Sequence, residues 1–445
     1  MQDDWQAMSA ADLGRGIEAG SICPVALAEG FLDAITAHPF GPRIYARDMR
    51  ARALDEAMAA RGRARAGLRR GPLDGVPVSW KDLFDTAGVA TESGSALLAG
   101  RVPEQDAEVL QRMTAAGTVA LGKTHQTEFA YSGLGLNPVT ATPPCVNDHD
   151  AVPGGSSSGA AASVAFGLAP LAIGSDTGGS VRIPAAWNDL VGLKTTHGRL
   201  SLAGVVPLAP RFDTVGPLAR TVEDAALALA IMEGAPVPDL RGADLSGVRL
   251  LVLEGAPFDD IRDRPRAGFE AALEAMGAAG GRIDRKNLPE VSEALALSAI
   301  IYTPECWAQW RDLLETAPDK VFAPILERFR SGRDHLAADY VAAWNRLNRL
   351  RRDYLAATAG YDAVLLPTAP NMPPDAARLM QEHGYFTTEN LLTLRNTRIG
   401  NMLGLCALTL PTGTPSAGIS LMMPPMADHR LLRLGAAAEV ALRRQ

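Results

Sequence analysis

Residues 152–163 read VPGGSSSGAAAS, a glycine- and serine-rich turn that continues into the small and apolar run AAASVAFGLAPLAIG. A linker would stay polar, whereas this run becomes apolar, so the turn is predicted to enter the core. Gly154 and Gly155 allow backbone conformations and close approaches that other residues resist. Backbone N–H groups at the start of a helix can also hold negative charge. The chain must therefore fold so that a buried helix begins at a serine-rich turn.

Runs of strand type alternate with helical patterns along the chain. Helices are predicted within residues 5–66 and at 106–116 and 156–166, and strands at 76–80, 119–122, 171–174, 248–253, 363–366 and 419–422. This alternation predicts an α/β fold with a central, mixed and largely buried sheet flanked by helices.

The second half of the chain shifts towards helix between about residues 262 and 361, with aromatic residues and leucines at helical spacing. Such stripes are typical of core faces. We found no internal repeat and no linker, so we expect one domain over 1–445. Its core would lie at about 66–235, and a variable helical insertion that shapes the substrate pocket would lie at about 255–360.

Composition excludes several classes of protein. The 445 residues carry a net charge of −7 and no block of five like charges, so a nucleic-acid surface is not expected. No run of 18 apolar residues predicts a membrane span, and the first residues do not resemble a secretory signal. Four scattered cysteines and seven histidines give no local sign of a metal site, although one could still assemble in space. The small number of separated cysteines leads us to expect a cytoplasmic protein.

A second glycine- and serine-containing loop, SDTGGSVRIP, follows the predicted strand at 171–174. Thr177, Gly178, Gly179 and Ser180 would present successive N–H groups around one hydroxyl, which is the composition of an oxyanion hole. Neither loop contains a histidine to act as base. Lys81 follows an apolar strand, and desolvation there would lower its pKa enough for the neutral amine to take a proton from a serine.

Each of these residues also has an ordinary structural interpretation. A single lysine such as Lys81 is usually solvated, Ser156 could be a helix N-cap, and Ser180 could be a turn serine. The run 155–159 also matches the GxSxG pattern of α/β-hydrolases, with Ser157 as nucleophile. That pattern needs a buried strand before it, whereas the residues here are CVNDHDAVP, so we reject it.

Several stretches, taken together and in this order, make the chain similar to the amidase signature family. They are GVPVSWKDLFDTAG (75–88), LGKTHQTEFAYSGLGLNP (121–138), VPGGSSSGAAASVAFGLAPLAIGSDTGGSVRIPAAW (152–187) and DTVGPLARTVEDA (213–225). Ser156 and Ser180 are separated by 24 positions, which is the family spacing. The resemblance resumes at DAVLLPTAP and RNTRIGNMLGLCALTLPTG, and it is weak between about 255 and 355.

The resemblance implies a role for each matching residue. Ser180 would be the nucleophile, Ser156 the bridging serine after a cis peptide bond, and Lys81 the base. The N–H groups of Thr177 to Ser180 would form the oxyanion hole, and Asp176 and Arg182 would brace their loop.

The substrate side of the site is implied in the same way. Ala130, Tyr131 and Ser157 would lie at the substrate, with Tyr131 the aromatic residue nearest to it, and Ser157 would also support the serine network. No metal and no organic cofactor is implied.

The resemblance implies an amidohydrolase that cleaves small or aryl amides through an acyl-enzyme, and that also acts on esters and carbamates (urethanes). Trp307 and Trp310 are available for an apolar pocket, although a core role for Trp307 is equally compatible with the sequence. The partners would be small molecules only, without nucleic acid or membrane, in a monomer or homodimer. The alternative is the amidase subunit of a glutamine-dependent tRNA amidotransferase. A non-catalytic binding protein is a third possibility, against which the intact serine–lysine set argues.

The chain also departs from the family pattern. Asn188 and Asp189 occupy the places of a Cys-Gly pair, and Thr195 replaces a proline. These changes are expected to alter packing behind the nucleophile loop more than chemistry. Ile183 stands where some malonamate-type amidases have an arginine for the substrate carboxylate, so a small carboxylated amide is not the expected substrate.

Overall fold

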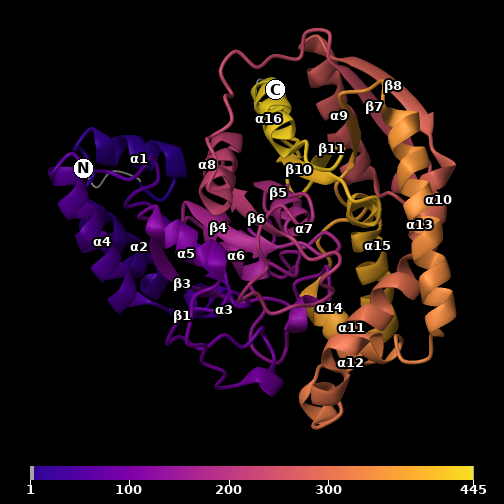
Figure 1. Cartoon of the computed structure of the whole chain (residues 1–445), viewed down its shortest axis with the longest axis horizontal. Coiled ribbons are helices and arrows are strands. Elements are labelled where there is room, and N and C mark those ends of the chain that lie inside the picture. The colour runs from indigo at the N-terminus through magenta and orange to yellow at the C-terminus, as the bar shows by residue number, and fades with distance from the viewer. Residues whose placement is uncertain (1–4, 444–445) are drawn as a thin grey trace.

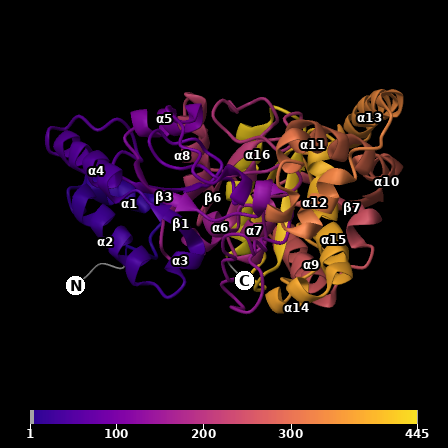
Figure 2. The same cartoon turned by 90° about the horizontal axis from the view of Figure 1, so that it is seen from below.

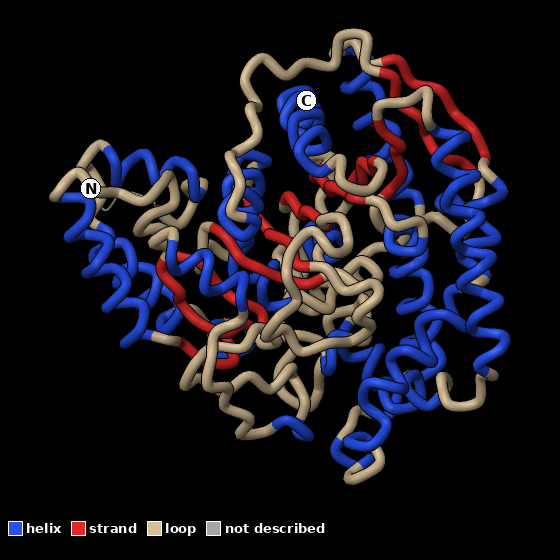
Figure 3. Tube along the Cα trace, viewed as in Figure 1, coloured by secondary structure: helices blue, strands red, loops and turns tan. Residues whose placement is uncertain are grey.

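The computed structural model describes residues 5–443, so the first four and last two residues of the predicted 1–445 domain lie outside it. Its centre is one mixed sheet of 11 strands, which runs through the middle of the molecule between helices (Figure 3). In sheet order the strands are β1 (Tyr45–Asp48), β3 (Val119–Thr124), β2 (Pro77–Lys81), β4 (Leu171–Ser175), β6 (Val215–Ala219), β5 (Val191–Lys194), β10 (Cys406–Pro411), β11 (Gly418–Met423), β9 (Ala363–Pro367), β7 (Arg249–Glu254) and β8 (Arg282–Asn287). The fold class predicted from the sequence is confirmed.

Sixteen α-helices and four short 3-10 helices connect these strands within the described residues. The α-helices are α1 (Ala10–Glu18), α2 (Pro24–Ala37), α3 (Gly41–Ile44), α4 (Arg50–Arg65), α5 (Glu108–Ala115), α6 (Ser158–Ala165), α7 (Arg182–Trp187), α8 (Val222–Glu233), α9 (Asp263–Ala278), α10 (Pro289–Ala296), α11 (Ser298–Leu314), α12 (Ala323–Arg330), α13 (Ala337–Thr358), α14 (Ala376–Gln381), α15 (His383–Met402) and α16 (Asp428–Leu442). The 3-10 helices are η1 (Ala96–Leu98), η2 (Glu128–Ala130), η3 (Ala256–Phe258) and η4 (Pro318–Lys320).

The strands predicted from apolar runs are all present, and five further strands were not predicted. β5 and β6 lack a clear signal because they are four and five residues long and contain glycine or proline. β8 reads RIDRKN, and its side chains are mostly exposed because it is the last strand of the sheet, so it has no apolar pattern. β1 is the short strand at the opposite edge, and β10 lies in the run GLCALTL, whose composition indicates core but not strand.

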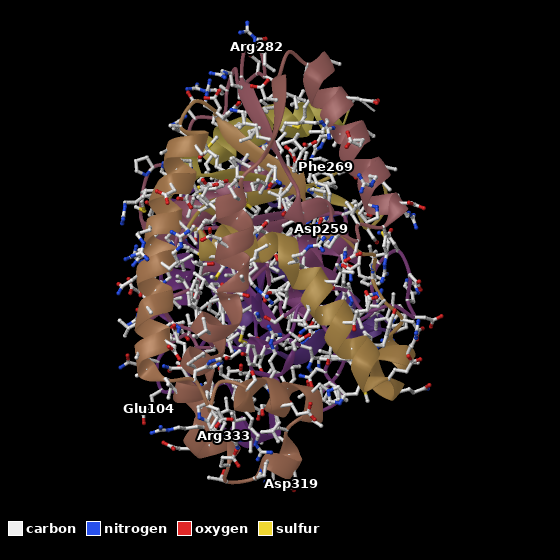
Figure 4. The ribbon with its side chains drawn as sticks, turned by 90° about the vertical axis from the view of Figure 1, so that its right-hand side faces the viewer. Glu104, Asp259, Phe269, Arg282, Asp319 and Arg333 are labelled. Carbon is white, nitrogen blue, oxygen red and sulfur yellow. The ribbon has the colours of Figure 1, made fainter. Side chains whose placement is uncertain are left out.

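Helices pack along the length of the sheet, and nearly all side chains of the inner strands are buried. α6 packs on β4 and β2, and α7 packs on β5 and β10. α8 packs on β6 and β5, and α16 packs on β10 and β11. Two views at right angles place α1, α2 and α4 at one end of the molecule and α10 to α13 at the other (Figures 1 and 2). Seen from the second end, Arg282 of β8 lies at the top of the molecule and Asp319 of η4 at the bottom (Figure 4). No helix among residues 5–443 has the length and apolar character needed to cross a membrane.

The order of two parallel strands determines where the chemistry can gather. β2 and β4 are neighbours, with Ser79 opposite Ala172 and Trp80 opposite Ile173. Their carboxyl ends therefore meet at one edge of the sheet, where open α/β sheets place their ligands. Lys81 is the last residue of β2, and Ser175 is the last residue of β4.

Candidate active site

Lys81 reaches two hydroxyl groups at the carboxyl end of the sheet. Its Nζ lies 2.7 Å from Ser156 Oγ and 2.9 Å from Ser175 Oγ, and all three residues are buried. No carboxylate among residues 5–443 forms an ion pair with this amine. A buried amine that contacts only hydroxyls has partners that can exchange a proton with it.

Burial lowers the pKa of Lys81 to about 7, because a charged ammonium loses its hydration there. The negative charges of Asp176 and Asp213 oppose this effect but do not cancel it. The apolar strand that precedes Lys81 predicted a lowered pKa, and the structure agrees in direction and cause. At neutral pH a substantial fraction of the amine is unprotonated and able to accept a proton.

The serine-rich turn does not act as the helix cap that the simpler interpretation suggested. The Gly155–Ser156 peptide bond is cis, as the resemblance implied. α6 begins at Ser158, and Ser157 occupies the N-cap position without a side-chain capping bond. The Oγ of Ser157 instead donates to the Ser175 carbonyl oxygen at 3.2 Å and accepts from the Ser175 N–H at 3.3 Å. The hydroxyls of Ser156 and Ser157 are thus directed to Lys81 and to β4.

Ser180 lies at the boundary between this buried network and a cavity. The residue is 4% exposed, it lines the cavity, and its carbonyl oxygen accepts a 3.2 Å hydrogen bond from the Ser157 N–H. The resemblance implied a proton relay from Ser180 through Ser156 to Lys81. The contact between Lys81 and Ser156 is formed, whereas no hydrogen bond joins the hydroxyls of Ser156 and Ser180, which are both among the described residues. Hydroxyl contacts at active sites are often long without substrate and shorten when it binds.

The loop that carries Ser180 is braced from below by a buried ion pair. Arg182 Nη2 lies 2.9 Å from Asp176 Oδ1, and both side chains are fully buried. The arginine holds the pKa of Asp176 well below its usual range against the opposing effect of burial. Gly179 adopts φ +138°, and a Cβ there would lie 2.1 Å from Thr397 Oγ1, so only glycine fits.

Three of the four predicted oxyanion-hole donors are free. The Gly179 N–H donates to Asp176 Oδ1 at 2.8 Å, so this group is already occupied. The N–H groups of Thr177, Gly178 and Ser180 have no acceptor within the part of the chain that the structure describes. The carbonyl groups of the loop are tied back, since Tyr302 donates to the Thr177 oxygen at 2.9 Å and Thr397 to the Gly178 oxygen at 2.7 Å.

A cavity of about 390 Å³ opens beside Ser180, within the range of roughly 300–1,000 Å³ that is typical of small-molecule sites. α11, α12 and α15 form much of its wall together with the two loops. Its lining residues are Ala130, Tyr131, Ser132, Thr177, Gly178, Ser180, Leu208, Ser298, Ala299, Tyr302, Thr303, Pro324, Glu327, Arg328, Ser331, His383, Phe386, Thr387, Asn390, Leu391, Leu394 and Arg398.

The cavity includes two of the three residues expected at the substrate. Ala130 and Tyr131 line it, whereas Ser157 does not, because its hydroxyl is turned to the backbone of Ser175. Trp307 and Trp310 are also absent from the lining. Trp310 donates its indole N–H to the Pro207 carbonyl oxygen and belongs to the packing between α11 and the loop before β6.

The model of the Amidase family matches residues 43–432. The chain belongs to the amidase family. It is therefore a hydrolase of carbon–nitrogen bonds in amides other than peptides, as predicted from the sequence.

This amidase resembles proteins whose names describe different activities. It is 34% identical to a 2-amino-5-chloromuconic acid deaminase of Comamonas testosteroni, over 84% of this chain and 83% of that protein. It is 32% identical to one subunit of the glutamyl-tRNA(Gln) amidotransferase of Salinispora arenicola, over 99% and 98% of the two chains. The solved peptide amidase of Stenotrophomonas maltophilia superposes with a TM-score of 0.82 at 27% identity, over 98% and 97%.

One member of the amidase's polar network, Ser175, was not predicted from the sequence. The chain order gives no sign of it, since only the pairing of β2 with β4 brings its hydroxyl to Lys81.

The departures from the family pattern have structural explanations. Asn188 donates to the carbonyl oxygens of Pro153 and Pro184, and Thr195 donates to that of Val215. Neither Asn188 nor Thr195 lines the cavity. No group of three His, Cys, Asp or Glu side chains suited to a metal ion occurs within residues 5–443.

Proposed function

We propose that this amidase hydrolyses small amides through an acyl-enzyme on Ser180. The observation that carries the proposal is the contact of Lys81 Nζ with Ser156 Oγ at 2.7 Å, made by an amine whose pKa is about 7. A neutral Lys81 takes the proton of Ser156, which takes that of Ser180 as Ser180 Oγ attacks the substrate carbonyl carbon. Two serines and a lysine thus perform the work of a serine–histidine pair.

Negative charge develops on the carbonyl oxygen in this step. The free N–H groups of Thr177, Gly178 and Ser180 are suitable donors to it, and fixed donors lose little energy to reorganisation. Collapse of the intermediate breaks the C–N bond, and the leaving amine takes the proton back from Lys81 by way of Ser156. Water then attacks the acyl group, which releases the acid and regenerates the Ser180 hydroxyl.

The same acyl-enzyme forms from esters and carbamates, because it does not retain the leaving group. The aromatic and aliphatic lining around Tyr131, Tyr302, Phe386 and Leu394 supports aryl amides, aryl esters or aryl carbamates as substrates. We expect the enzyme to act as a monomer or homodimer, without nucleic acid or cofactor.

A fluorophosphonate probe followed by mass spectrometry tests the nucleophile. The probe should add covalently to the peptide that contains Ser180, and Ser180→Ala should abolish both labelling and turnover while circular dichroism stays unchanged. Label on another serine, or turnover by Ser180→Ala, would show that the assignment is wrong.

The second candidate is the amidase subunit of a tRNA amidotransferase, supported by 32% identity over 99% of this chain. Such a subunit would release ammonia from glutamine and pass it to a partner. The purified chain should therefore be assayed alone with glutamine and with aryl amides. Turnover of aryl amides without partner subunits favours the independent hydrolase, and a specific need for glutamine together with partner subunits favours the amidotransferase.

A further inference from the structure

The wall of the active-site cavity carries two arginine side chains that have no carboxylate partner among residues 5–443. Arg398 of α15 and Arg328 of α12 both line the cavity and are half-buried. Arg182 differs from both, because it is buried beneath the nucleophile loop and forms an ion pair with Asp176 at 2.9 Å.

The hydrogen bonds made within residues 5–443 leave most donors of these two guanidinium groups unused. Arg398 Nη1 donates to Ser298 Oγ at 3.3 Å, and Arg328 Nη1 donates to the Tyr131 carbonyl oxygen at 2.8 Å. The Arg328 guanidinium also lies 4.3 Å from the centroid of the Tyr131 ring. Each guanidinium has five N–H donors in a planar fork that matches a carboxylate.

The other charged groups of the cavity do not neutralise this pair. Glu327 is the single carboxylate in the lining that the described residues provide, and it lies 3.1 Å from His383 with 63% of its side chain exposed. Burial together with the charge of Arg328 lowers the pKa of Arg398 to about 10, which still leaves it protonated at neutral pH. Enclosed charges are normally paired, so two neighbouring cations without an anion favour a ligand that brings one.

The helix that carries Arg398 is fixed to the nucleophile loop. Thr397, its neighbour, donates to the Gly178 carbonyl oxygen at 2.7 Å. One face of α15 lines the cavity with both polar and apolar side chains and ends in a cation. Its lining residues are His383, Phe386, Thr387, Asn390, Leu391, Leu394 and Arg398. A substrate lying along this face would meet Ser180 and the arginine within a single cavity of about 390 Å³.

We propose that Arg398 and Arg328 form a carboxylate subsite, and that the preferred substrates are small amides whose acyl part ends in a free carboxylate. This inference rests on the proposed function of Ser180. It revises the expectation drawn from Ile183, because cations reach the cavity from α12 and α15 and not from the position three residues after the nucleophile. Product release would then free a dicarboxylic acid.

Two substrates of nearly equal shape test the subsite. 4-Carbamoylbenzoate carries the carboxylate, and terephthalamide replaces it with a neutral amide. Because hydrogen bonds to charged groups contribute about 1.5–3 kcal/mol, the enzyme should prefer 4-carbamoylbenzoate by roughly 10- to 100-fold in kcat/KM. The linear pair adipamate and adipamide should give a preference of the same sign.

Arg398→Met should remove most of this preference. It should lower kcat/KM for 4-carbamoylbenzoate by about 10- to 100-fold and change that for terephthalamide by less than about threefold. Arg398→Lys should keep a weaker preference of the same sign, because the charge remains and the fork is lost. Arg395→Met is the matched control on the same helix, since Arg395 does not line the cavity, and it should leave the preference unchanged.

Equal losses on both substrates in Arg398→Met, or no preference in the wild-type enzyme for either pair, would overturn the inference and leave the proposed function intact. A binding experiment tests the carboxylate subsite without relying on the proposed role of Ser180. Ser180→Ala should bind 4-carbamoylbenzoate in isothermal titration calorimetry, and adding Arg398→Met should weaken that binding at least tenfold. This result would stand even if Ser180 proved not to be the nucleophile, and failure of the second change to weaken binding would refute the subsite.

Discussion

Lys81 and Lys123 are two fully buried lysines on neighbouring parallel strands, β2 and β3, yet their surroundings differ in kind. Lys81 contacts two serine hydroxyls. Lys123 donates to the Phe84 carbonyl oxygen and to Thr91 Oγ1, and lies 3.5 Å from Asp82. Burial lowers the pKa of Lys81 to about 7 and that of Lys123 to about 8.

A lowered pKa therefore does not identify the base on its own. The partners of Lys123 are a carbonyl, a threonine and a carboxylate that hold it in place, and none of them lines the cavity. The partners of Lys81 include Ser156, whose neighbour Ser157 donates its N–H to the Ser180 carbonyl oxygen. The difference teaches that contact with the hydroxyl of Ser156, added to burial, distinguishes the proposed base from a lysine that is held by structural contacts.

The largest effect should come from removing each lysine's amine in turn. Lys81→Met should lower kcat/KM by about 10⁴-fold or more, because residues that act as one unit fail together. Lys123→Met should change kcat/KM by less than about tenfold, since the amine does not touch the relay. Steady-state kinetics on one aryl amide, with circular dichroism for both variants, makes the comparison. Similar losses in both would mean that burial and not connection sets the role.

The second effect distinguishes two serines of the same turn. Ser156→Ala removes the hydroxyl that Lys81 contacts and should cost about 10³-fold or more in kcat. Ser158 is equally buried, but its hydroxyl faces the His125 carbonyl oxygen at 3.4 Å, outside the relay. Ser158→Ala should therefore cost less than about fivefold, within the range of a small packing change. Equal losses would restore the view that the stretch only starts a helix.

The candidate catalytic residues could be proposed from the sequence because each lies in a short run whose order is distinctive. Lys81 ends an apolar strand, and Ser156 and Ser180 each follow a pair of glycines. Local sequence carries such signals. The lowered pKa of Lys81 was predictable for the same reason, since the strand before it is apolar and its burial follows.

The parts of the site that could not be predicted from the sequence depend on long-range packing. Ser175 meets Lys81 only through the register of β2 with β4. Arg328 and Arg398 come from helices far apart in the sequence, and neither is distinctive before α12 and α15 pack around one cavity. The expectation that Trp307 and Trp310 contribute to the pocket was wrong, since neither lines the cavity. Aromatic residues at helical spacing do not indicate which face of a helix meets the core and which meets a cavity.

The third prediction concerns the pH dependence of activity. In the proposed mechanism the neutral form of Lys81 is the active one. Because its pKa is about 7, kcat/KM should rise about tenfold per pH unit below that value and level off above it. This rise in kcat/KM with pH reports the coupled titration of Lys81 and Ser156, since the two groups share a proton. Lys123→Met should leave the midpoint in place. A midpoint that moves with Lys123, or a flat profile between pH 5 and 8, would contradict the assignment.

The smallest expected effect is on the free energy of unfolding. The two lysines differ in the pH at which their contribution to it begins to rise. The pKa of Lys81 is about 7 in the folded protein against an ordinary value of 10.5, so between these values the unfolded chain binds more protons than the folded protein does. The free energy of unfolding therefore gains from Lys81 as pH rises from about 7 to 10.5, and lacks this gain at lower pH. For Lys123, whose folded pKa is about 8, the same gain begins about one unit higher.

The two methionine variants should separate these contributions. The Tm of Lys81→Met relative to wild type should be highest near pH 6 and begin to fall from pH 7, whereas that of Lys123→Met should stay level to about pH 8 before it falls. Since one pKa unit corresponds to about 1.4 kcal/mol, the difference between the two trends is on the order of 1 kcal/mol. Lys123→Met should also start lower, because the Phe84 carbonyl oxygen loses a donor and Asp82 loses a nearby cation. Thermal unfolding of both variants and wild type across pH 6 to 10 would measure this. If Lys81→Met lowers the Tm near pH 6 as much as Lys123→Met does, Lys81 is also held mainly by stabilising contacts. The two lysines would then differ only in the kinetic effects of their substitution.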